Sequence, residues 1–550
     1  MAHNPLRRRK DAAQLDVAII GGGHNGLVAA AYLARAGLSV LVLERRSIVG
    51  GAAVTEEFAP GFRNSTASYT VSLLHPRIIR ELSLAEFGLR IVPRPMQNFL
   101  PLPQGGYLCA PNSPVALMAE VARHSKHDAE SLPAWRSYIG AAAEQLRALA
   151  LETPPTNLAR WPDRWRMVRF GRRMRALPLE DQRSLYELFT RSAGELLDHW
   201  FESDALKALY GFDAVVGNYA SPYTPGSAYV LLHHAFGEVN GQRGVWGHAI
   251  GGMGAITQAM ARSARERGAL IETDASVERV LIERGRAVGV ELSSGRCIRA
   301  GTVVANVNPK LLYLQLIEPG HLPADFVASM QRYRCGSASF RMNVALAELP
   351  RFSAVQSVSG PLRASIDAGE HLRAGIILAP SLGYMDRAFA TARLQGYSSQ
   401  PIVEMVIAST LDDSLAPAGA HVASLFCQHF APVLPEGRSW ESARDQMANL
   451  IIETVEQYAP NFRRALIAHS ALTPSDLEQR FGLIGGDIFH GALGLDQLWA
   501  ARPVLGYAAY RSPITGLYLC GAGAHPGGGV SGLPGYNAAR RILRDRRALK

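Results

Sequence analysis

The chain has 550 residues, of which 48% are apolar and 19% charged, and a formal net charge of +10. This length is too great for one small core and predicts two interleaved domains. No apolar run approaches the ~20 residues of a membrane-spanning helix. The excess positive charge lies in three short runs, at 7–10, 160–175 and 540–550, rather than over a broad face, so nucleic-acid binding is not expected.

The five cysteines are far apart and form no Cys-x-x-Cys pair, which argues against a redox-active disulfide and a zinc site. They are Cys109, Cys297, Cys335, Cys427 and Cys520. The first sixteen residues are basic but lack the apolar stretch of a secretory signal. We therefore expect a cytoplasmic protein if the source is a bacterium, and one of the mitochondrial matrix if it is a eukaryote.

Residues 16–44 predict a nucleotide-binding strand-turn-helix-strand unit. An apolar strand at 16–20 enters the turn GGGHNG at 21–26, and a helix and a second strand at 39–43 follow. The spacing of the glycines recurs at 527–532, but only the first copy stands between an apolar strand and a long helix.

Each part of this unit has an expected contact with a dinucleotide. The first glycine allows the turn, the third lets the backbone approach a pyrophosphate, and the last lets the helix pack closely on the strand. The helix amino terminus offers N–H groups to the phosphates. An acid at the end of the second strand accepts hydrogen bonds from a ribose, and its charge disfavours NADP. These residues are Gly21, Gly23, His24, Asn25, Gly26 and Glu44.

The middle of the chain predicts a second domain. Residues 115–150 and 178–215 are expected to be helical, and residues 334–348 and 401–408 to form strands. On a helix through 160–177, Met167, Phe170, Met174 and Leu177 form an apolar stripe among arginines. This segment is either a peripheral contact with an anionic membrane or an arginine-rich helix docked on the protein, and we favour the second.

Two further segments resemble parts of a dinucleotide site. Residues 251–306 begin with a glycine turn and a helix, and continue as short strands that return the chain through TVVAN to the main sheet. Near the carboxy terminus, an apolar strand at 516–520 is followed by small residues and a final helix. A stretch without large side chains suits a flat ring lying against bare backbone.

These segments resemble the phytoene desaturase-like branch of the FAD-dependent amine oxidase superfamily, and most closely the pyridine nucleotide-disulphide oxidoreductase domain-containing protein 2 group. The resemblance covers nearly the whole chain and is strongest in DVAIIGGGHNGLVAAAYLARAG, GGMGAITQAMA and GGDIFHGALGLDQLWAARPVLGYAAYRSPITGLYLCGAGAHPGGGVSG. It implies an α/β fold, in which a Rossmann-like FAD-binding domain of the glutathione reductase and amine oxidase type is interleaved with an α+β substrate domain. The expected domains are 14–80, 246–310 and 481–550 for FAD, and 81–245 and 311–480 for the substrate.

The resemblance also implies further FAD contacts. A glycine pair shortly after the ribose-binding acid would follow the nucleotide, the strand at 277 would contact the adenine, and the carboxy-terminal segment would border the flavin. The residues expected to contribute are Arg45, Gly50, Gly51, Ala52, Val277, Asn306, Gly521, Gly523, His525, Pro526 and Gly532.

The implied reaction is hydride transfer between flavin N5 and a hydrophobic substrate, such as a polyene, an isoprenoid or another lipid. Desaturation, saturation and isomerisation are all compatible with this site, and oxygen and a quinone both remain open as electron acceptors. One alternative is a flavin amine oxidase, with Tyr507, Tyr510 and Tyr518 as candidate aromatic residues over the flavin. Another is a non-catalytic lipid- or prenyl-binding protein, as in Rab GDP dissociation inhibitors.

No catalytic residue is identified from the sequence, and His525 is the one weak candidate. Four other histidines fall near the expected flavin or substrate segments, and each is expected to be structural: His233, His234, His248 and His490. No group of histidines or carboxylates has the spacing of metal ligands, so no metal is expected.

Overall fold

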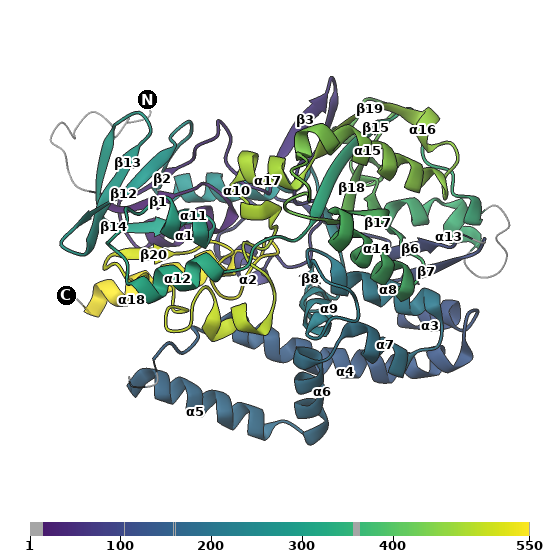
Figure 1. The fold of residues 1–550 in the computed structure, drawn as a ribbon, viewed down its shortest axis with the longest axis horizontal. Coiled ribbons are helices and arrows are strands. Elements are labelled where there is room, and N and C mark those ends of the chain that lie inside the picture. The colour runs from purple at the N-terminus through teal and green to yellow at the C-terminus, as the bar shows by residue number, and fades with distance from the viewer. Residues whose placement is uncertain (1–14, 104, 158, 160, 356–362, 549–550) are drawn as a thin grey trace.

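The computed structural model describes residues 15–103, 105–157, 159, 161–355 and 363–548. Two large β-sheets lie in separate halves of the molecule, and helices pack around each of them (Figure 1). The basic run at 7–10 lies outside the described residues. Among the helices that the structure describes, none has both the length and the apolar composition needed to cross a membrane.

The first sheet has seven strands in the order β11-β2-β1-β14-β13-β12, with β20 paired to β14. β1, β2, β11, β20 and the second half of β14 run parallel, whereas β12, β13 and the first half of β14 pair antiparallel. The strands come from distant parts of the chain: β1 (Leu15–Ile20), β2 (Val40–Leu43), β11 (Leu270–Glu272), β12 (Val277–Glu283), β13 (Arg286–Leu292), β14 (Cys297–Ala305) and β20 (Leu517–Leu519). This is the α/β nucleotide-binding fold that the sequence predicts.

The carboxyl ends of these parallel strands meet at one edge of the sheet. Ile20 is in register with Leu43 on one side and with Ala305 on the other, and Ala305 is in register with Leu519. The residues that follow these strand ends therefore lie side by side, although they come from opposite ends of the chain. Ligands of open α/β sheets bind at this edge.

Helix α1 (His24–Arg35) packs between α10 (Met253–Glu266) and α18 (Leu533–Ala548). Helices α11 (Pro309–Leu314) and α12 (Ala324–Arg332) join the same core, where the ring of Phe326 lies 4.8 Å from that of Tyr313 and 4.9 Å from that of Tyr507. The expected domain boundary at 310 thus falls inside this core.

The second sheet has seven strands in the order β19-β15-β18-β17-β16-β6-β7. All neighbours pair antiparallel except β16 and β6. The strands are β6 (Met96–Pro101), β7 (Tyr107–Pro111), β15 (Ser339–Leu346), β16 (Gly375–Leu378), β17 (Tyr397–Val406), β18 (His421–Phe430) and β19 (Leu466–Leu472). The predicted strands at 334–348 and 401–408 correspond to β15 and β17.

The two faces of this sheet differ in chemistry because side chains alternate along each strand. One face carries Phe340, Met342 and Leu425, which pack in an apolar core with α15 (Trp440–Glu456). On the other face Arg341, Phe426 and Glu404 are direct neighbours on β15, β18 and β17. This second face therefore carries two charged residues beside Phe426, and both charged side chains lie against Tyr69.

A helical layer covers the rest of this second face. The predicted helix at 115–150 is interrupted because Ser125 caps the longer piece, with its Oγ accepting a 3.0 Å hydrogen bond from the Asp128 N–H. The segment predicted at 178–215 likewise forms three helices. The layer consists of α3 (Pro114–Val121), α4 (Lys126–Ala150), α6 (Leu179–Thr190), α7 (Ala193–Trp200), α8 (Asp204–Val215), α9 (Ser227–Ala235) and α14 (Leu382–Gln395).

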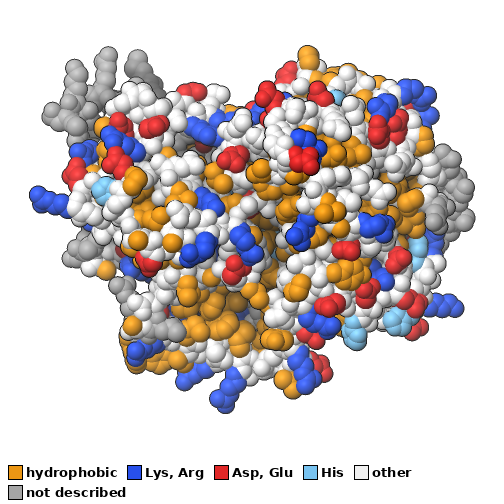
Figure 2. All heavy atoms as spheres, viewed as in Figure 1, with side chains coloured by type: hydrophobic (Ala, Val, Ile, Leu, Met, Phe, Trp, Pro, Cys, Tyr) orange, Lys and Arg blue, Asp and Glu red, His pale blue; other side chains and the backbone are white. Residues whose placement is uncertain are grey.

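Helix α5 (Trp161–Ala176) lies at the lower edge of the molecule in Figure 1. The predicted stripe is half-buried towards the protein, and the Phe170 ring lies 4.9 Å from that of Trp499. Figure 2 shows hydrophobic side chains gathered between α5 and the rest of the molecule. A different set faces solvent, including Trp161, Trp165 and Val168. The stripe is therefore a docking face and not the outer face of the helix.

The remaining elements are short. They are α2 (Pro76–Glu81), β3 (Thr55–Ala59), β4 (Phe62–Ser65), β5 (Ile91–Pro93), β8 (Glu238–Val239), β9 (Gln242–Arg243), β10 (Gly247–Ala249), α13 (Arg363–Asp367), α16 (Phe462–Ala465) and α17 (Pro474–Phe481).

Candidate functional site

Glu44 stands at the end of β2 and is only 6% exposed. The Gly22 N–H donates to its Oε2 at 2.8 Å, and the Arg46 N–H donates to its Oε1 at 3.0 Å. Backbone hydrogen bonds of 2.9 Å also join Glu44 to Glu272 and to Ala275. The carboxylate is therefore held in place beside the strand that carries the predicted adenine contact.

The amino terminus of α1 is shaped for a polar ligand. Gly23 occupies the cap position and supplies no side-chain cap, so the first N–H groups of the helix have no partner within it. Both polar side-chain atoms of Asn25 and the Nε2 of His24 are buried without a hydrogen-bond partner. Buried polar groups are normally satisfied, and a phosphate group at this helix end would accept hydrogen bonds from the Asn25 Nδ2 and from a protonated His24 Nε2.

Asn306 follows β14 and fastens the glycine turn. Its Nδ2 donates to the carbonyl oxygen of Gly21 at 3.2 Å. Gly21 has a φ of +92°, and a Cβ at Gly23 would lie 2.9 Å from this Nδ2. The turn therefore requires glycine at both positions.

A cavity of about 280 Å³ runs along this edge of the sheet. It continues past the end of α1 to Ala522, Gly528 and Gly529, so both ends of the chain contribute to one binding site. The predicted cofactor residues that line it are Gly21, Gly23, His24, Asn25, Glu44, Arg45, Gly50, Gly51, Ala52, Val277 and Asn306.

The other predicted cofactor residues do not line this cavity. A Cβ at Gly26 would lie 2.3 Å from the Gly21 oxygen, and one at Gly523 would lie 2.3 Å from Pro309 Cγ, so these glycines allow close packing. Ala522, Gly528, Gly529 and Val530 line the cavity in their place. The residues outside the cavity wall are Gly26, Gly521, Gly523, His525, Pro526 and Gly532.

His525, the weak catalytic candidate, faces away from this cavity. Its Nε2 lies 3.0 Å from the carbonyl oxygen of Leu149, and the Tyr510 hydroxyl donates to the His525 carbonyl at 3.0 Å. Burial lowers the pKa of the His525 ring to about 4. The imidazole is therefore neutral and joined to α4, and these contacts do not support the weak candidacy of His525 as a catalytic residue.

The far end of the cavity has a wall of which the sequence indicated only His234. Tyr69, Thr70, Trp246 and Phe426 line it, together with His234. The Tyr69 and Phe426 rings stack with centroids 5.5 Å apart. The surrounding apolar residues are Leu73, Val216, Ile488 and Phe489.

Charged residues lie directly behind this wall. The Tyr69 hydroxyl donates to the Glu404 carboxylate, and the Nη1 of Arg94 lies 3.7 Å from Glu404 Oε1. Arg94 also donates to the Thr70 hydroxyl at 2.8 Å, and Arg341 Cζ lies 4.4 Å from the centre of the Tyr69 ring. These side chains come from segments far apart in the sequence, which is why no local pattern could reveal them.

Two of the histidines that were expected to be structural, His248 and His490, lie in different surroundings. His248 Nε2 lies 3.1 Å from Asp412 Oδ2. Burial alone would raise the pKa of Asp412, but hydrogen bonds from His248, Ser414 and the Gly251 N–H outweigh it and lower the pKa to about 2. His490 lines the cavity, and burial lowers its pKa to about 3.

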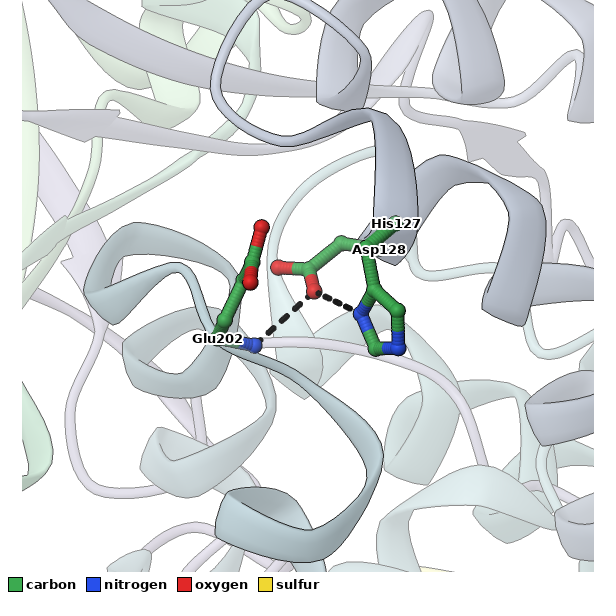
Figure 3. A group of neighbouring side chains, drawn as sticks. All are labelled: His127, Asp128 and Glu202. Atoms are coloured by element: carbon green, nitrogen blue, oxygen red, sulfur yellow. Dashed lines mark hydrogen bonds and ion pairs between the residues drawn. The ribbon is translucent and has the colours of Figure 1, made fainter.

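One cluster of potential metal-ligating side chains, His127, Asp128 and Glu202, lies away from this cavity (Figure 3). Asp128 Oδ1 accepts hydrogen bonds from the Glu202 N–H at 2.9 Å and from His127 Nδ1 at 3.2 Å, and Oδ2 accepts one from the Ser203 N–H at 2.9 Å. Asp128 thus fastens the start of α8, and these contacts give the cluster a structural role.

The sequence model of the flavin containing amine oxidoreductases matches residues 26–340. The chain belongs to this family. It is 40% identical over 557 residues to pyridine nucleotide-disulfide oxidoreductase domain-containing protein 2 of Rattus norvegicus, covering 97% of this chain and 94% of that one. It is 25% identical to a phytoene desaturase (lycopene-forming) of Pseudescherichia vulneris, covering 94% of this chain and 96% of that one.

The fold of this flavin-containing amine oxidoreductase is also similar to that of cyclohexylamine oxidase from Brevibacterium oxydans IH-35A. The TM-score is 0.57 at 17% identity, over 97% of this chain and 100% of that one. The family assignment confirms an FAD-dependent oxidoreductase with a Rossmann-like FAD-binding domain and a substrate domain.

FAD fits the residues present in this family member. Glu44 would bind the adenosine ribose, the start of α1 with His24 and Asn25 would bind the pyrophosphate, and the bare backbone at 528–529 would border the flavin ring. Bound FAD supplies the capacity to accept or give a hydride, and the chain supplies its position and surroundings.

Proposed function

We propose that this protein transfers a hydride between flavin N5 and a hydrophobic substrate such as a polyene, an isoprenoid or another lipid. The observation that carries the proposal is the composition of the far cavity wall. Among the described residues that line the whole cavity, Glu44 is the only carboxylate, and it lies at the nucleotide end. The substrate end contains apolar, aromatic and neutral polar side chains and no carboxylate among the described residues.

This wall argues against an amine substrate. An ammonium group taken out of water needs a negative partner, and the nearby Glu404 carboxylate is already engaged by Arg94 and Tyr69. The tyrosines considered for an amine oxidase also lie elsewhere, because Tyr507, Tyr510 and Tyr518 are outside the cavity wall. A hydrophobic substrate leaves no such charge uncompensated.

In this mechanism the chain positions the substrate and excludes water. Phe426, Phe489 and Ile488 form an apolar surface that removes water from the reacting carbon. Desaturation, saturation and isomerisation all need this arrangement, and the relative that is named a phytoene desaturase suggests the first.

The test uses the FAD-loaded protein under anaerobic conditions. Isoprenoid hydrocarbons and alcohols on one side, and putrescine and cyclohexylamine on the other, are added while the absorbance of oxidised flavin is followed. Bleaching by members of the first group alone supports the proposal, and bleaching by the amines alone overturns it. Mixing the reduced protein with oxygen or with a soluble quinone then identifies the electron acceptor.

A further inference from the structure

The nucleotide end of the cavity is walled on one side by a helix that follows the second sheet. Helix α17 comes directly after β19 and lies between the two halves of the molecule (Figure 1). Its carboxyl end lines the cavity, as Glu44 and Val277 also do. The lining residues at this end are Arg480, Phe481 and Gly482. The end of α17 therefore covers the part of the cavity where the adenosine of FAD is expected.

A carboxylate between two arginines joins this helix end to the first domain. Glu56 lies on β3, and its Oε1 is 2.7 Å from Arg46 Nη2 and 2.9 Å from Arg480 Nη2. Its Oε2 accepts a 3.0 Å hydrogen bond from the Thr66 hydroxyl. Burial alone would raise the pKa of Glu56, but the two guanidinium groups outweigh it and lower the pKa. The carboxylate is therefore charged near neutral pH and bridges the two cations.

The same two arginines hold the aromatic ring at the end of α17. The ring centre of Phe481 lies 5.0 Å from Arg46 Cζ and 5.5 Å from Arg480 Cζ, and a guanidinium group over an aromatic ring is attracted to it. Arg45 adds a third contact, because its Nη2 donates to the carbonyl oxygen of Gln479 at 2.9 Å. Charged side chains thus tie the end of α17 to the residues that follow β2.

The start of the same helix is anchored by other contacts. Thr473 and Asp476 form a capping box, and Arg444 of α15 donates to Asp476 Oδ1 through Nη2 at 2.7 Å. Leu477 is fully buried in a small apolar cluster. None of these contacts involves Glu56. Loss of the Glu56 bridge would therefore loosen mainly the helix end that lines the cavity.

We infer that Glu56 is a positioning residue for the cofactor: by pairing with Arg46 and Arg480, it holds α17 against the nucleotide end of the cavity and slows the release of FAD. One carboxylate shared by two partly exposed arginines is a network, which contributes more than an isolated surface pair. The inference concerns the cofactor, and it does not depend on the proposed substrate.

The alternative is that Arg480 binds a phosphate of FAD directly, since this side chain lines the cavity. The two roles predict opposite effects of removing the Glu56 charge. If Glu56 holds the helix, its removal breaks the bridge and FAD leaves faster. If Glu56 only competes with the phosphates for Arg480, its removal frees the guanidinium group and FAD leaves more slowly.

The test measures the release of FAD from the loaded full chain. Each protein is diluted, and the fluorescence of free flavin in the filtrate is followed with time at low and at high NaCl concentration. Glu56→Gln should release FAD about fivefold faster than the unmodified protein at low salt. Added NaCl should speed release from the unmodified protein more than from Glu56→Gln, because salt screens the bridge.

Glu57→Gln is the matched control, because it removes the same charge one residue away. Glu57 is exposed, and its Oε1 accepts a 3.1 Å hydrogen bond from the Gly61 N–H. This variant should release FAD at the unmodified rate. Arg480→Met should act in the same direction as Glu56→Gln, and the double variant should release FAD no faster than Glu56→Gln alone, since both changes break one bridge.

Hydrogen exchange distinguishes this role from a general loss of stability. In the unmodified protein, bound FAD should slow the exchange of the backbone amides at 477–483. In the FAD-free protein, Glu56→Gln should speed exchange at these amides, while thermal unfolding shows that the variant is folded. Arg480→Met tests the bridge from its other side if Glu56→Gln cannot be loaded with FAD, and an unchanged release rate in that variant would overturn the inference.

Release from Glu56→Gln at or below the unmodified rate would also overturn the inference and favour direct binding of FAD by Arg480. Equal acceleration in Glu56→Gln and Glu57→Gln would do the same, since the change in charge alone would then explain the result. Exchange at 477–483 that does not respond to FAD would show that α17 does not cover the cofactor. Each of these outcomes leaves the proposed function standing.

Discussion

The guanidinium of Arg502 donates to the carbonyl oxygen of Ala522 through both Nε, at 3.2 Å, and Nη2, at 2.9 Å. Arg502 is fully buried, and its Nη2 also donates to the Phe489 carbonyl at 2.7 Å. Phe489 and Ala522 both line the cavity. One side chain therefore joins the substrate wall to the segment beside the flavin.

Arg502→Met should lower the free energy of unfolding by about 3 kcal/mol, because it leaves several buried carbonyl groups without donors. We also expect faster loss of FAD, since the cavity wall loosens. Urea unfolding and flavin retention on gel filtration measure the two effects. Arg183→Met, at an exposed position, is the control and should change neither.

Glu44→Gln should weaken FAD binding by about tenfold or more. Each carboxylate oxygen already accepts one backbone N–H, and an amide can offer only one acceptor oxygen at this position. The ratio of flavin to protein after dialysis gives the measurement. Glu130→Gln, an exposed change, should keep the normal ratio, and full FAD content in Glu44→Gln would contradict the assigned role.

Arg94→Met should destabilise the protein by about 3–5 kcal/mol, because the Glu404 carboxylate is left buried without its cation. The double variant Arg94→Met/Glu404→Leu should recover part of this loss, since no unpaired charge remains. Chemical unfolding of the two variants gives the comparison. A double variant less stable than Arg94→Met alone would contradict this explanation and show that Glu404 stabilises the protein through its hydrogen bond from Tyr69.

Acid should destabilise the protein between pH 6.5 and 4, partly through His371. Burial lowers the pKa of His371 from 6.5 to about 4, so in this window the unfolded chain binds a proton that the folded chain does not. This stability is fully present above pH 6.5 and is lost as the pH falls towards 4. His371→Phe should reduce the loss by up to about 1.4 kcal/mol per pH unit in urea titrations. The exposed His469→Phe should leave the slope unchanged.

Helix α5 should be stabilised by docking on the protein rather than by lipid. Phe170→Ala should lower stability by about 3 kcal/mol at most, because it removes the contact with Trp499 from a half-buried site. The unmodified protein should not float with anionic vesicles. Flotation that is lost in Trp161→Ser/Trp165→Ser would contradict this and indicate membrane contact through the exposed face.

Local patterns predicted the cofactor and the fold class because both depend on short contiguous segments. Gly21, Gly23 and Glu44 belong to one strand-turn-helix-strand unit, whose conformation depends on glycine and on apolar periodicity. The carboxy-terminal segment contributes to the cavity, as its sequence predicts. The residues of this segment that line the cavity are Ala522, Gly528 and Gly529, and not the predicted glycines. Which glycine faces a ligand and which faces a helix depends on packing that a single segment does not contain.

The amino-acid sequence by itself determined that this chain binds FAD on a Rossmann-like sheet. The tertiary structure alone decided the substrate wall, since Tyr69, His234 and Glu404 come from three separate parts of the chain. It also decided that His525 points towards α4, and that the apolar stripe of α5 faces inward. The physical reason is the range of the interactions: glycine turns and strand periodicity act within a few residues, whereas hydrogen bonds and ion pairs across a cavity exist only after distant strands have come together.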